Sequence, residues 1–280
     1  MKITGVQSGV RESKEKTLAY IQTLFAGDEF HDTDLVALPE MFQCPYENAQ
    51  FPSYAEPEGG ETWQFCSGLA RQNGVYLSAG TIPEVADGRI YNTAYVFDRA
   101  GRQIAKYRKT HLFDIDIRGG QHFRESDTLT AGDEMVVFDT EFGKMGICIC
   151  YDLRFPELSR LMTDAGARLI LCPAAFNMTT GPMHWELLFR QRAVDNQVFL
   201  IGTSPARDKR ASYQAWGHSI VVDPWGRVLT EMDETEQVKV TEIDLSVVDE
   251  VREQLPLLKH RRSDLYELRV RKKQIFQNND

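Results

Sequence analysis

Strand passes directly into helix within the stretch Gly146-Ile147-Cys148-Ile149-Cys150-Tyr151-Asp152-Leu153-Arg154-Phe155-Pro156-Glu157. The apolar run up to Cys150 is typical of a buried strand. Pro156 suits the first turn of a helix, because the N–H that proline lacks would be unpaired there. The pattern predicts a strand-to-helix elbow with Cys150 at its turn, near backbone amides that favour a thiolate. Cys150 is therefore a candidate nucleophile, whereas Cys148, inside the strand, is expected to be a packing residue.

Outward from this elbow, short apolar runs alternate with amphipathic segments along the chain. The apolar runs predict strands over residues 2–8, 35–38, 75–82, 91–97 and 102–107. The last two strands are expected to pair across the turn at 98–101. A helix is predicted over residues 61–73, and another begins after Ser13, whose hydroxyl suits a helix cap. This alternation of strands and helices is typical of an α/β protein.

The second half of the chain repeats segments of the first. Three pairs of segments match in the same order: 73–83 with 196–205, 96–102 with 221–227 and, more faintly, 38–40 with 172–174. Chance could produce one match, but three in order indicate two similar halves. The simplest packing of two such halves is a pair of mixed sheets, face to face, with helices outside. No linker divides the chain, so a single domain over residues 1–280 is expected.

The composition excludes several classes of protein. The formal net charge of −9 argues against nucleic-acid binding, and the basic cluster at 259–273 is interrupted by acidic residues, as on a solvated helix face. No apolar run approaches the ~18 residues of a membrane span, and no signal-peptide pattern begins the chain. Five cysteines without CxxC spacing favour a reducing cytoplasm. No metal-ligand spacing or nucleotide-binding motif occurs, so neither a metal nor a cofactor is expected.

Two further polar residues stand at predicted strand ends. Glu40 closes the apolar run that begins at Leu35, and Lys109 closes the predicted strand before it. Taken singly, these residues and Cys150 have ordinary explanations: a surface glutamate, a solvated lysine and a small buried hydrophobe. Sites in α/β proteins are, however, assembled at the ends of neighbouring strands. Glu40, Lys109 and Cys150 could therefore belong to one site.

A glutamate, a lysine and a cysteine at three strand ends, in this order, resemble the triad of the nitrilase (carbon–nitrogen hydrolase) superfamily. The matching motifs are Leu38-Pro39-Glu40-Met41-Phe42, Tyr107-Arg108-Lys109-Thr110-His111-Leu112 and the elbow after Cys150. Further segments resemble the omega-amidase branch of this superfamily: 123–126, 175–182, 184–188, 192–197 and 204–208. The resemblance covers nearly the whole chain and is specific enough to outweigh the three ordinary explanations.

The resemblance implies a four-layer α-β-β-α sandwich of two mixed sheets, in agreement with the two similar halves. It also implies that Glu40 takes the proton of Cys150 and later gives it to ammonia. A charged lysine cannot act as a base, so Lys109 fits better as a partner for the developing oxyanion. The backbone N–H of Tyr151 would be the second oxyanion donor. Glu125 matches the second glutamate of the family, which holds the lysine and borders the substrate.

The omega-amidase resemblance implies a substrate that is a small 2-oxo acid with a terminal amide, such as 2-oxoglutaramate or 2-oxosuccinamate. The protein must then bind a carboxylate. Arg154 is the first candidate, because arginine binds carboxylates bidentately, and a structural ion pair with Glu157 or Asp152 is an equal alternative. The other residues expected near the substrate are Tyr46, Phe176, Asn177, Met178 and Thr203.

Two other functions stay open at this point. The same triad with a different pocket would act on deaminated glutathione or another small amide. A non-catalytic nitrilase-like interaction domain would be expected to lack a triad member, and this chain has all three. A true nitrilase is disfavoured, since Trp-Glu usually follows its cysteine instead of Tyr151-Asp152. The family usually forms dimers, so a homodimer is expected, with the tail at about residues 256–280 packing at its interface.

Overall fold

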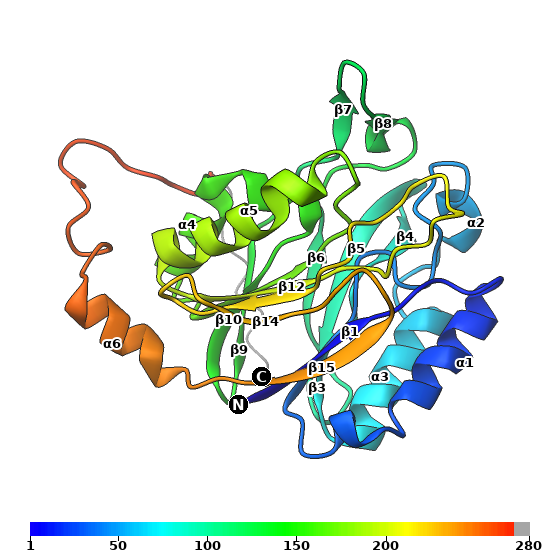
Figure 1. Cartoon of the computed structure of the whole chain (residues 1–280), viewed down its shortest axis with the longest axis horizontal. Coiled ribbons are helices and arrows are strands. Elements are labelled where there is room, and N and C mark those ends of the chain that lie inside the picture. The colour runs from blue at the N-terminus through cyan, green and yellow to red at the C-terminus, as the bar shows by residue number, and fades with distance from the viewer. Residues whose placement is uncertain (272–280) are drawn as a thin grey trace.

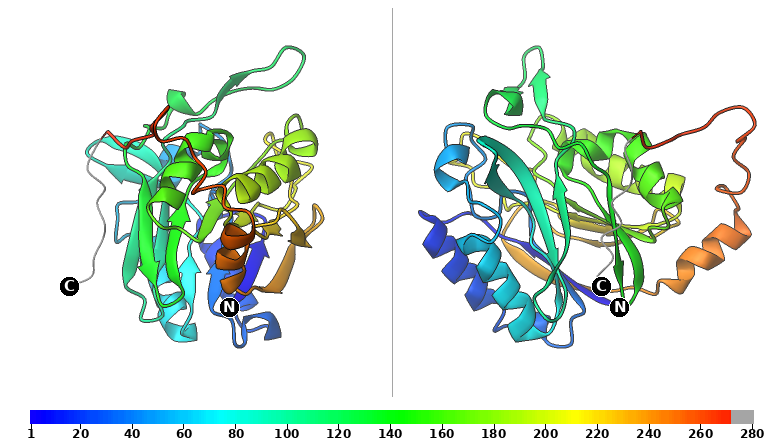
Figure 2. Two further views of the ribbon diagram at one scale, coloured as in Figure 1. Left: turned by 90° about the vertical axis from the view of Figure 1, so that its left-hand side faces the viewer. Right: turned by 180° about the vertical axis from the view of Figure 1, so that it is seen from behind.

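Two β-sheets pack face to face between layers of helices (Figure 1). The computed structural model describes residues 1–271, so the end of the segment 256–280 predicted at a dimer interface lies outside the described residues. Helices α1 (Lys14–Leu24) and α3 (Glu61–Asn73) cover one sheet, and α4 (Pro156–Asp164) and α5 (Gly181–Asn196) cover the other (Figure 2). The four-layer α-β-β-α sandwich expected from the sequence is confirmed.

The first sheet has the strand order β15-β1-β2-β3-β5-β4, and β6 also pairs with β5. Its strands are β1 (Lys2–Gln7), β2 (Leu35–Ala37), β3 (Tyr76–Ser78), β4 (Ile82–Ala86), β5 (Arg89–Phe97), β6 (Gln103–Arg108) and β15 (Gln237–Glu242). The second sheet has the order β14-β13-β12-β11-β10-β9. Its strands are β9 (Val136–Thr140), β10 (Gly143–Ile147), β11 (Leu169–Pro173), β12 (Phe199–Thr203), β13 (Ile220–Val222) and β14 (Val228–Glu231).

Shorter elements complete the described chain. The hairpin of β7 (Asp114–Asp116) and β8 (His122–Arg124) projects at the top of Figure 1. The remaining helices are α2 (Phe51–Tyr54) and α6 (Ser246–Gln254), with single 3₁₀ turns η1 (Asp28–Phe30), η2 (Glu125–Asp127) and η3 (Cys150–Arg154). Among the described residues 1–271, no helix is long and apolar enough to cross a membrane.

Both sheets follow one plan, as the internal repeat predicts. Each contains three neighbouring parallel strands, β1-β2-β3 in the first sheet and β10-β11-β12 in the second. Antiparallel strands flank them on both sides: β15 and β5 in the first sheet, β9 and β13 in the second. Strand β15, the last strand within residues 1–271, thus returns to the first sheet. Because the carboxyl ends of parallel strands meet at one edge, residues that follow these strands are brought together there.

Alternating side chains of the strands build the core between the sheets. In β2, Leu35 and Ala37 belong to the cluster that includes Ile147 and Leu169 of the second sheet. Val36, between them, packs with residues of α1 and α3 on the outer face. Successive side chains of a strand point to opposite faces of the sheet. Because both faces of β2 are buried, the short strand is apolar throughout.

One predicted strand is interrupted, and the interruption lies beside the site described below. The expected strand over 75–82 is divided into β3 and β4, because Gly80 adopts a left-handed conformation with φ of +56°. A Cβ atom at Gly80 would lie 2.0 Å from the carbonyl oxygen of Pro39. Only glycine therefore allows the chain to pass so close to the backbone that precedes Glu40. The helix predicted over 61–73 is confirmed as α3.

Candidate active site

Cys150 lies at the turn between β10 and α4, as the elbow predicts. It begins the 3₁₀ turn η3 and has a φ of +49°, which side-chain-bearing residues rarely adopt. Such backbone strain persists only where the surrounding structure enforces it, and it is common at functional sites. α4 begins at Pro156, also as predicted. The Cys150 side chain is buried, and Cys148, inside the same core, is buried as well.

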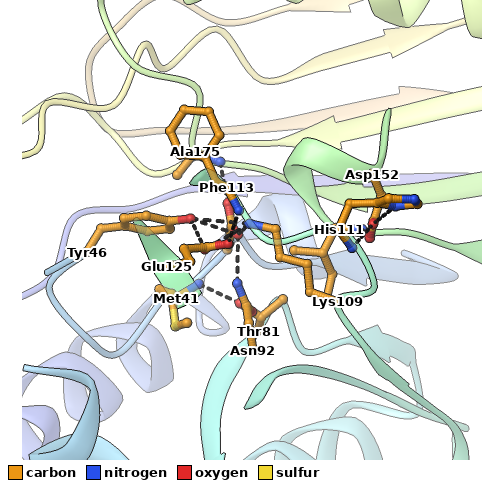
Figure 3. A network of polar contacts seen from close by, with 12 residues as sticks. Met41, Tyr46, Thr81, Asn92, Lys109, His111, Phe113, Glu125, Asp152 and Ala175 are labelled. Carbon is orange, nitrogen blue, oxygen red and sulfur yellow. Dashed lines mark hydrogen bonds and ion pairs between the residues drawn. The ribbon is translucent and has the colours of Figure 1, made fainter. Parts of the chain in front are cut away.

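A fully buried lysine lies between two fully buried glutamates. Figure 3 shows this lysine, Lys109, with one of them, Glu125. Lys109 directly follows β6, and its Nζ donates to Glu40 Oε1 at 3.0 Å and to Glu125 Oε1 at 2.9 Å. Glu125 Oε1 also accepts the Tyr46 hydroxyl at 2.5 Å, and its Oε2 accepts the backbone N–H of Phe113 at 2.6 Å. Glu40, Lys109 and Glu125 come from distant segments of the chain, and the family resemblance implies that they lie together.

Besides Lys109 and a 3.3 Å contact with the Tyr46 hydroxyl, two hydrogen bonds hold the Glu40 carboxylate in place. Its Oε1 accepts a hydrogen bond from Asn92 Nδ2 of β5 at 2.8 Å, and its Oε2 accepts one from Ala175 N at 2.7 Å. Ala175 follows β11, so this second bond joins the loops of the two sheets. Met41, the next residue, has a φ of +50° and donates its N–H to Thr81 Oγ1 at 2.8 Å. The carboxylate is therefore fixed from three sides before any substrate binds.

Burial and mutual charge shift the pKa values of this group in different directions. Burial raises the pKa of the Glu40 carboxyl, with a smaller rise from Glu125 and an opposing effect of Lys109. For Lys109, burial would lower the pKa, but the carboxylates of Glu125 and Glu40 raise it well above its ordinary value. The lysine is therefore a permanent cation. Burial, followed by Glu40, raises the pKa of the Cys150 thiol, and Lys109 opposes that rise. The resting cysteine is a neutral thiol that needs a base.

Tyr151 and Arg154 follow Cys150 within η3. The neighbouring Asp152 N–H bonds to the Ile149 carbonyl at 3.0 Å, whereas the Tyr151 N–H has no bonded acceptor among the described residues. The Arg154 guanidinium lies 4.7 Å from the centre of the Phe176 ring, and its Nη1 contacts His184 Nδ1 at 3.1 Å. Within residues 1–271, Arg154 forms no ion pair with a carboxylate. The structural pair with Glu157 or Asp152 is therefore absent from the described structure.

The other predicted substrate residues lie in different surroundings. Tyr46 is part of the Glu125 and Lys109 network. Asn177 is buried, and its Oδ1 accepts the N–H groups of Thr179 and Thr180, while its Nδ2 has no partner in the described part of the chain. Thr203 donates its hydroxyl to the Leu38 carbonyl at 2.9 Å, so this group joins the two sheets. Met178 is 40% exposed.

A pocket of about 560 Å³ reaches this group from the surface. Its inner wall includes Glu40, Tyr46, Ala175 and Tyr213, and its outer part is lined by the loop at 205–211 and residues 9–12. Its lining does not include Cys150, Lys109, Arg154 or the predicted residues 176–178. The pocket therefore reaches the site at Glu40.

Several residues of the site were not found from the sequence. Asn92 and Tyr213 carry no pattern that separates them from other strand and loop residues. The Tyr213 hydroxyl donates to the Ala175 carbonyl at 2.5 Å, and its ring packs on Tyr46. Asp152 stands two residues after the nucleophile, and this position is the signal that could have drawn attention to it. In the described residues, no group of three or more His, Cys, Asp or Glu side chains could hold a metal.

The fold is that of the nitrilase superfamily. The model of the carbon–nitrogen hydrolase family matches residues 2–253, and the chain belongs to this family.

The relatives are consistent with this membership. "Omega-amidase NIT2" of Mus musculus is 47% identical over 95% of this chain and 97% of its own length. "Omega-amidase NIT2" of Homo sapiens is 50% identical over 85% of this chain and 86% of its length. Among solved structures, Nit3 of Saccharomyces cerevisiae, described as a member of branch 10 of the nitrilase superfamily, has a TM-score of 0.84 and 42% identity. That match covers 94% of this chain and 96% of the Nit3 chain.

Proposed function

We propose that this chain is an omega-amidase, which hydrolyses the terminal amide of small 2-oxo acids such as 2-oxoglutaramate and 2-oxosuccinamate. One observation carries the proposal: a buried lysine cation held by two buried carboxylates, beside a buried cysteine thiol on a strained turn. Stabilising a new negative charge in a water-excluded site is what amide hydrolysis requires. The omega-amidase relatives, which align over most of the chain, support this choice of substrate.

The proposed first half-reaction forms a thioester. Cys150 Sγ attacks the amide carbon, and Glu40 accepts the thiol proton in the same step. Because burial raises the pKa of Glu40, its carboxylate is a stronger base than an exposed glutamate. Lys109 and the Tyr151 N–H stabilise the oxygen anion that forms. Glu40 then protonates the nitrogen, the carbon–nitrogen bond breaks, and ammonia leaves the acyl group on Cys150.

The second half-reaction hydrolyses the thioester. A water attacks the acyl carbon while Glu40, again ionised, accepts one of its protons. The second tetrahedral oxyanion uses the same two donors. The carbon–sulfur bond then breaks, the proton returns from Glu40 to the sulfur, and the dicarboxylic acid is released. Glu125 takes no proton in this scheme: it holds the lysine in its charged form, as its 2.9 Å contact with Lys109 Nζ suggests.

For recognition of the substrate carboxylate we propose Arg154. Its guanidinium lacks a carboxylate partner among the described residues and rests on Phe176, an arrangement that leaves the charge available to a ligand. Burial lowers the pKa of Arg154, as expected for a cation that gains its anion only when substrate binds. Asn177 Nδ2, which is buried and unpartnered, is the proposed second donor. Phe176 and Met178 would border the acyl chain, and Thr203 would fix the loop at Leu38.

Mass spectrometry of the intact protein tests the thioester. After brief incubation with 2-oxoglutaramate and acid quenching, wild type is expected to carry the acyl group and to release ammonia. Cys150→Ala should show neither, whereas Cys148→Ala, which changes a neighbouring buried thiol, should keep both. Wild-type ammonia release by Cys150→Ala would show the mechanism to be wrong.

An ammonia-release panel with 2-oxoglutaramate, 2-oxosuccinamate, glutamine and deaminated glutathione tests the substrate. We expect the first two to be preferred. Deaminated glutathione is the second candidate. If that compound dominates, the chain is an amidase of another specificity.

For Arg154→Gln, kcat/KM for 2-oxoglutaramate should fall on the order of 100-fold, the loss of one charge-assisted interaction. Hydrolysis of a neutral amide without a carboxylate should change little.

We also propose that the protein is a single-domain cytoplasmic homodimer without a cofactor. The free cysteines, all of them buried, are consistent with a reducing compartment. Exposed apolar side chains of the segment after α6, among them Leu257, Leu265 and Tyr266, are consistent with a tail that packs against a second copy.

A further inference from the structure

Asp152 is a buried carboxylate that the proposed mechanism does not use. It is fully buried, and within residues 1–271 no lysine or arginine forms an ion pair with it. Five hydrogen bonds satisfy it instead. Its Oδ1 accepts hydrogen bonds from Thr110 Oγ1 at 3.0 Å, from the His111 backbone N–H at 2.9 Å and from His111 Nδ1 at 2.7 Å. Its Oδ2 accepts the Tyr107 hydroxyl and the Ile149 N–H, at 2.7 and 2.9 Å.

These donors come from two segments, and each segment carries a residue of the site. Tyr107, Thr110 and His111 lie on both sides of Lys109, at the end of β6 in the first sheet. Ile149 directly precedes Cys150, after β10 of the second sheet. Figure 3 shows Asp152 and His111 next to Lys109, on the side away from Tyr46. The carboxylate therefore connects the chain around the lysine with the chain around the thiol.

One ring contact makes the same connection, because His111 stacks on Phe155 with ring centres 3.7 Å apart. The nearby polar contacts lie elsewhere: within residues 1–271, the backbone of Lys109 bonds to Asn92 and Gly132 alone, outside the elbow. Glu40 bonds to Ala175, and Thr203 to Leu38, so these two bridges reach the second sheet at β11 and β12 rather than at the elbow. In the part of the chain that the structure describes, the Asp152 bonds are the hydrogen bonds that join the elbow to the end of β6.

A carboxylate is the group that this place requires. Both of its oxygens accept hydrogen bonds and neither donates, so all five donors can be satisfied at once. An asparagine has one acceptor oxygen, and its NH₂ would face at least two donors whichever way it is turned. A buried donor without an acceptor costs about 1–3 kcal/mol. The two segments are then expected to move apart.

We infer that Asp152 is a positioning residue, which fixes the Lys109 ammonium relative to the Cys150 thiol so that both reach one substrate carbonyl. The inference rests on the proposed function and names a further residue of the same site. Asp152 touches no reacting atom and transfers no proton. Its effect passes through Lys109 and Cys150, because it binds the Tyr107 hydroxyl before the lysine, the His111 N–H after it, and the Ile149 N–H before the cysteine.

Steady-state kinetics of Asp152→Asn and Tyr107→Phe test the inference. Tyr107→Phe keeps the ring and removes one of the five bonds, so it gives a result even if Asp152→Asn fails to fold. For Asp152→Asn, kcat should fall by about 100-fold or more with KM changed less than about threefold, the pattern of a contact needed only in the transition state. Tyr107→Phe should lower kcat by about 5- to 10-fold. Tyr95→Phe, which removes a buried hydroxyl that has no partner among residues 1–271, is the control and should match wild type.

Alkylation of Cys150 by iodoacetamide, followed by intact mass, provides a second readout that needs no amidase activity. Displacement of the lysine should move the pH dependence of alkylation to higher pH, because the cation favours the thiolate. A loosened fold would instead expose the thiol and accelerate the reaction. Unchanged kcat, a rise in KM alone, or faster alkylation in either variant would overturn the positioning role. If wild type releases no ammonia from any amide, the proposed function fails, and the alkylation profiles alone decide the role of Asp152.

Discussion

The hydroxyl of Tyr46 belongs to the hydrogen-bond network of the site. Tyr46 donates to Glu125 at 2.5 Å and lies 3.3 Å from Lys109 Nζ, while its ring packs against Phe51 and Phe123. Tyr46→Phe keeps the ring and removes the hydroxyl. We expect kcat to fall about tenfold and the free energy of unfolding to fall by about 1–2 kcal/mol, because Glu125 loses a buried donor.

Tyr95→Phe is the matched control, because the Tyr95 hydroxyl is buried without a partner in the described structure. This variant should keep its activity and be as stable as wild type or more so. Urea unfolding and ammonia release on both variants make the comparison. Equal effects of the two substitutions would show that the Tyr46 hydroxyl has no special role.

At this scale, sequence could predict the residues whose chemistry is distinctive but not their partners. Glu40, Lys109 and Cys150 stand in motifs at strand ends, and the structure brings their segments to one edge. Asn92 could not have been predicted, since an amide in a strand becomes a partner of Glu40 only through the pairing of distant strands. For Arg154, sequence predicts a ligand role and an ion pair equally, and only its surroundings show that the pair does not form in the described residues.

Among the elements, the break between β3 and β4 positions the loop of Glu40. Gly80→Ala would bring a Cβ to within 2.0 Å of the Pro39 oxygen, so the chain before Glu40 must shift. Gly88→Ala is the matched control: Gly88 also has a positive φ, of +70°, and nothing lies within 4 Å of its added Cβ. Both variants bear the left-handed strain, about 1 kcal/mol, and only Gly80→Ala adds the clash. We expect Gly80→Ala to lose both stability and kcat, and Gly88→Ala to lose only a little stability. Thermal unfolding and kinetics of the pair measure this.

Strands β4, β5 and β6 are joined by a buried carboxylate, Glu84. It accepts bonds from Arg108 and Thr93 and pairs with Lys106. Burial would raise the pKa of Glu84, but the bonds from these neighbours outweigh it and hold the pKa below its ordinary value. A lowered pKa means that the folded state favours the ionised form. The stabilisation is therefore present above the ordinary pKa of glutamate and is lost as the pH falls through the lower folded-state value.

Glu84→Gln should accordingly lower the free energy of unfolding at pH 7 by about 1–3 kcal/mol. The difference from wild type should shrink in acid, once Glu84 is protonated in both states. Urea unfolding at several pH values measures it. Glu58→Gln, at an exposed partner of the same Lys106, is the control, with an expected effect below about 1 kcal/mol. A gap that is independent of pH would contradict the assignment.

Over the whole molecule, the repeat made the two-sheet plan predictable, because each half could be read as the same series of strands. The repeat does not predict how one sheet is positioned on the other, and the site depends on that position. The contacts that set it, from Asp152 to Tyr107 and from Thr203 to Leu38, join residues far apart in sequence. Such contacts have no local signal. The position of strand β15 could not be predicted either, because its place beside β1 depends on strand pairing and not on composition.

The proposed homodimer is tested at this scale. In the segment after α6, Leu265 and Tyr266 are 69% and 56% exposed, an unusual exposure for large apolar side chains if no second copy covers them. Leu265→Ser combined with Tyr266→Ser should therefore convert a dimer into monomers, as measured by light scattering after size-exclusion chromatography. Leu229→Ser, which removes another exposed leucine, at the edge strand β14, is the control and should leave the dimer intact. A monomeric wild type would contradict the homodimer. A double variant that remains dimeric would keep the homodimer and place its interface elsewhere than at this segment.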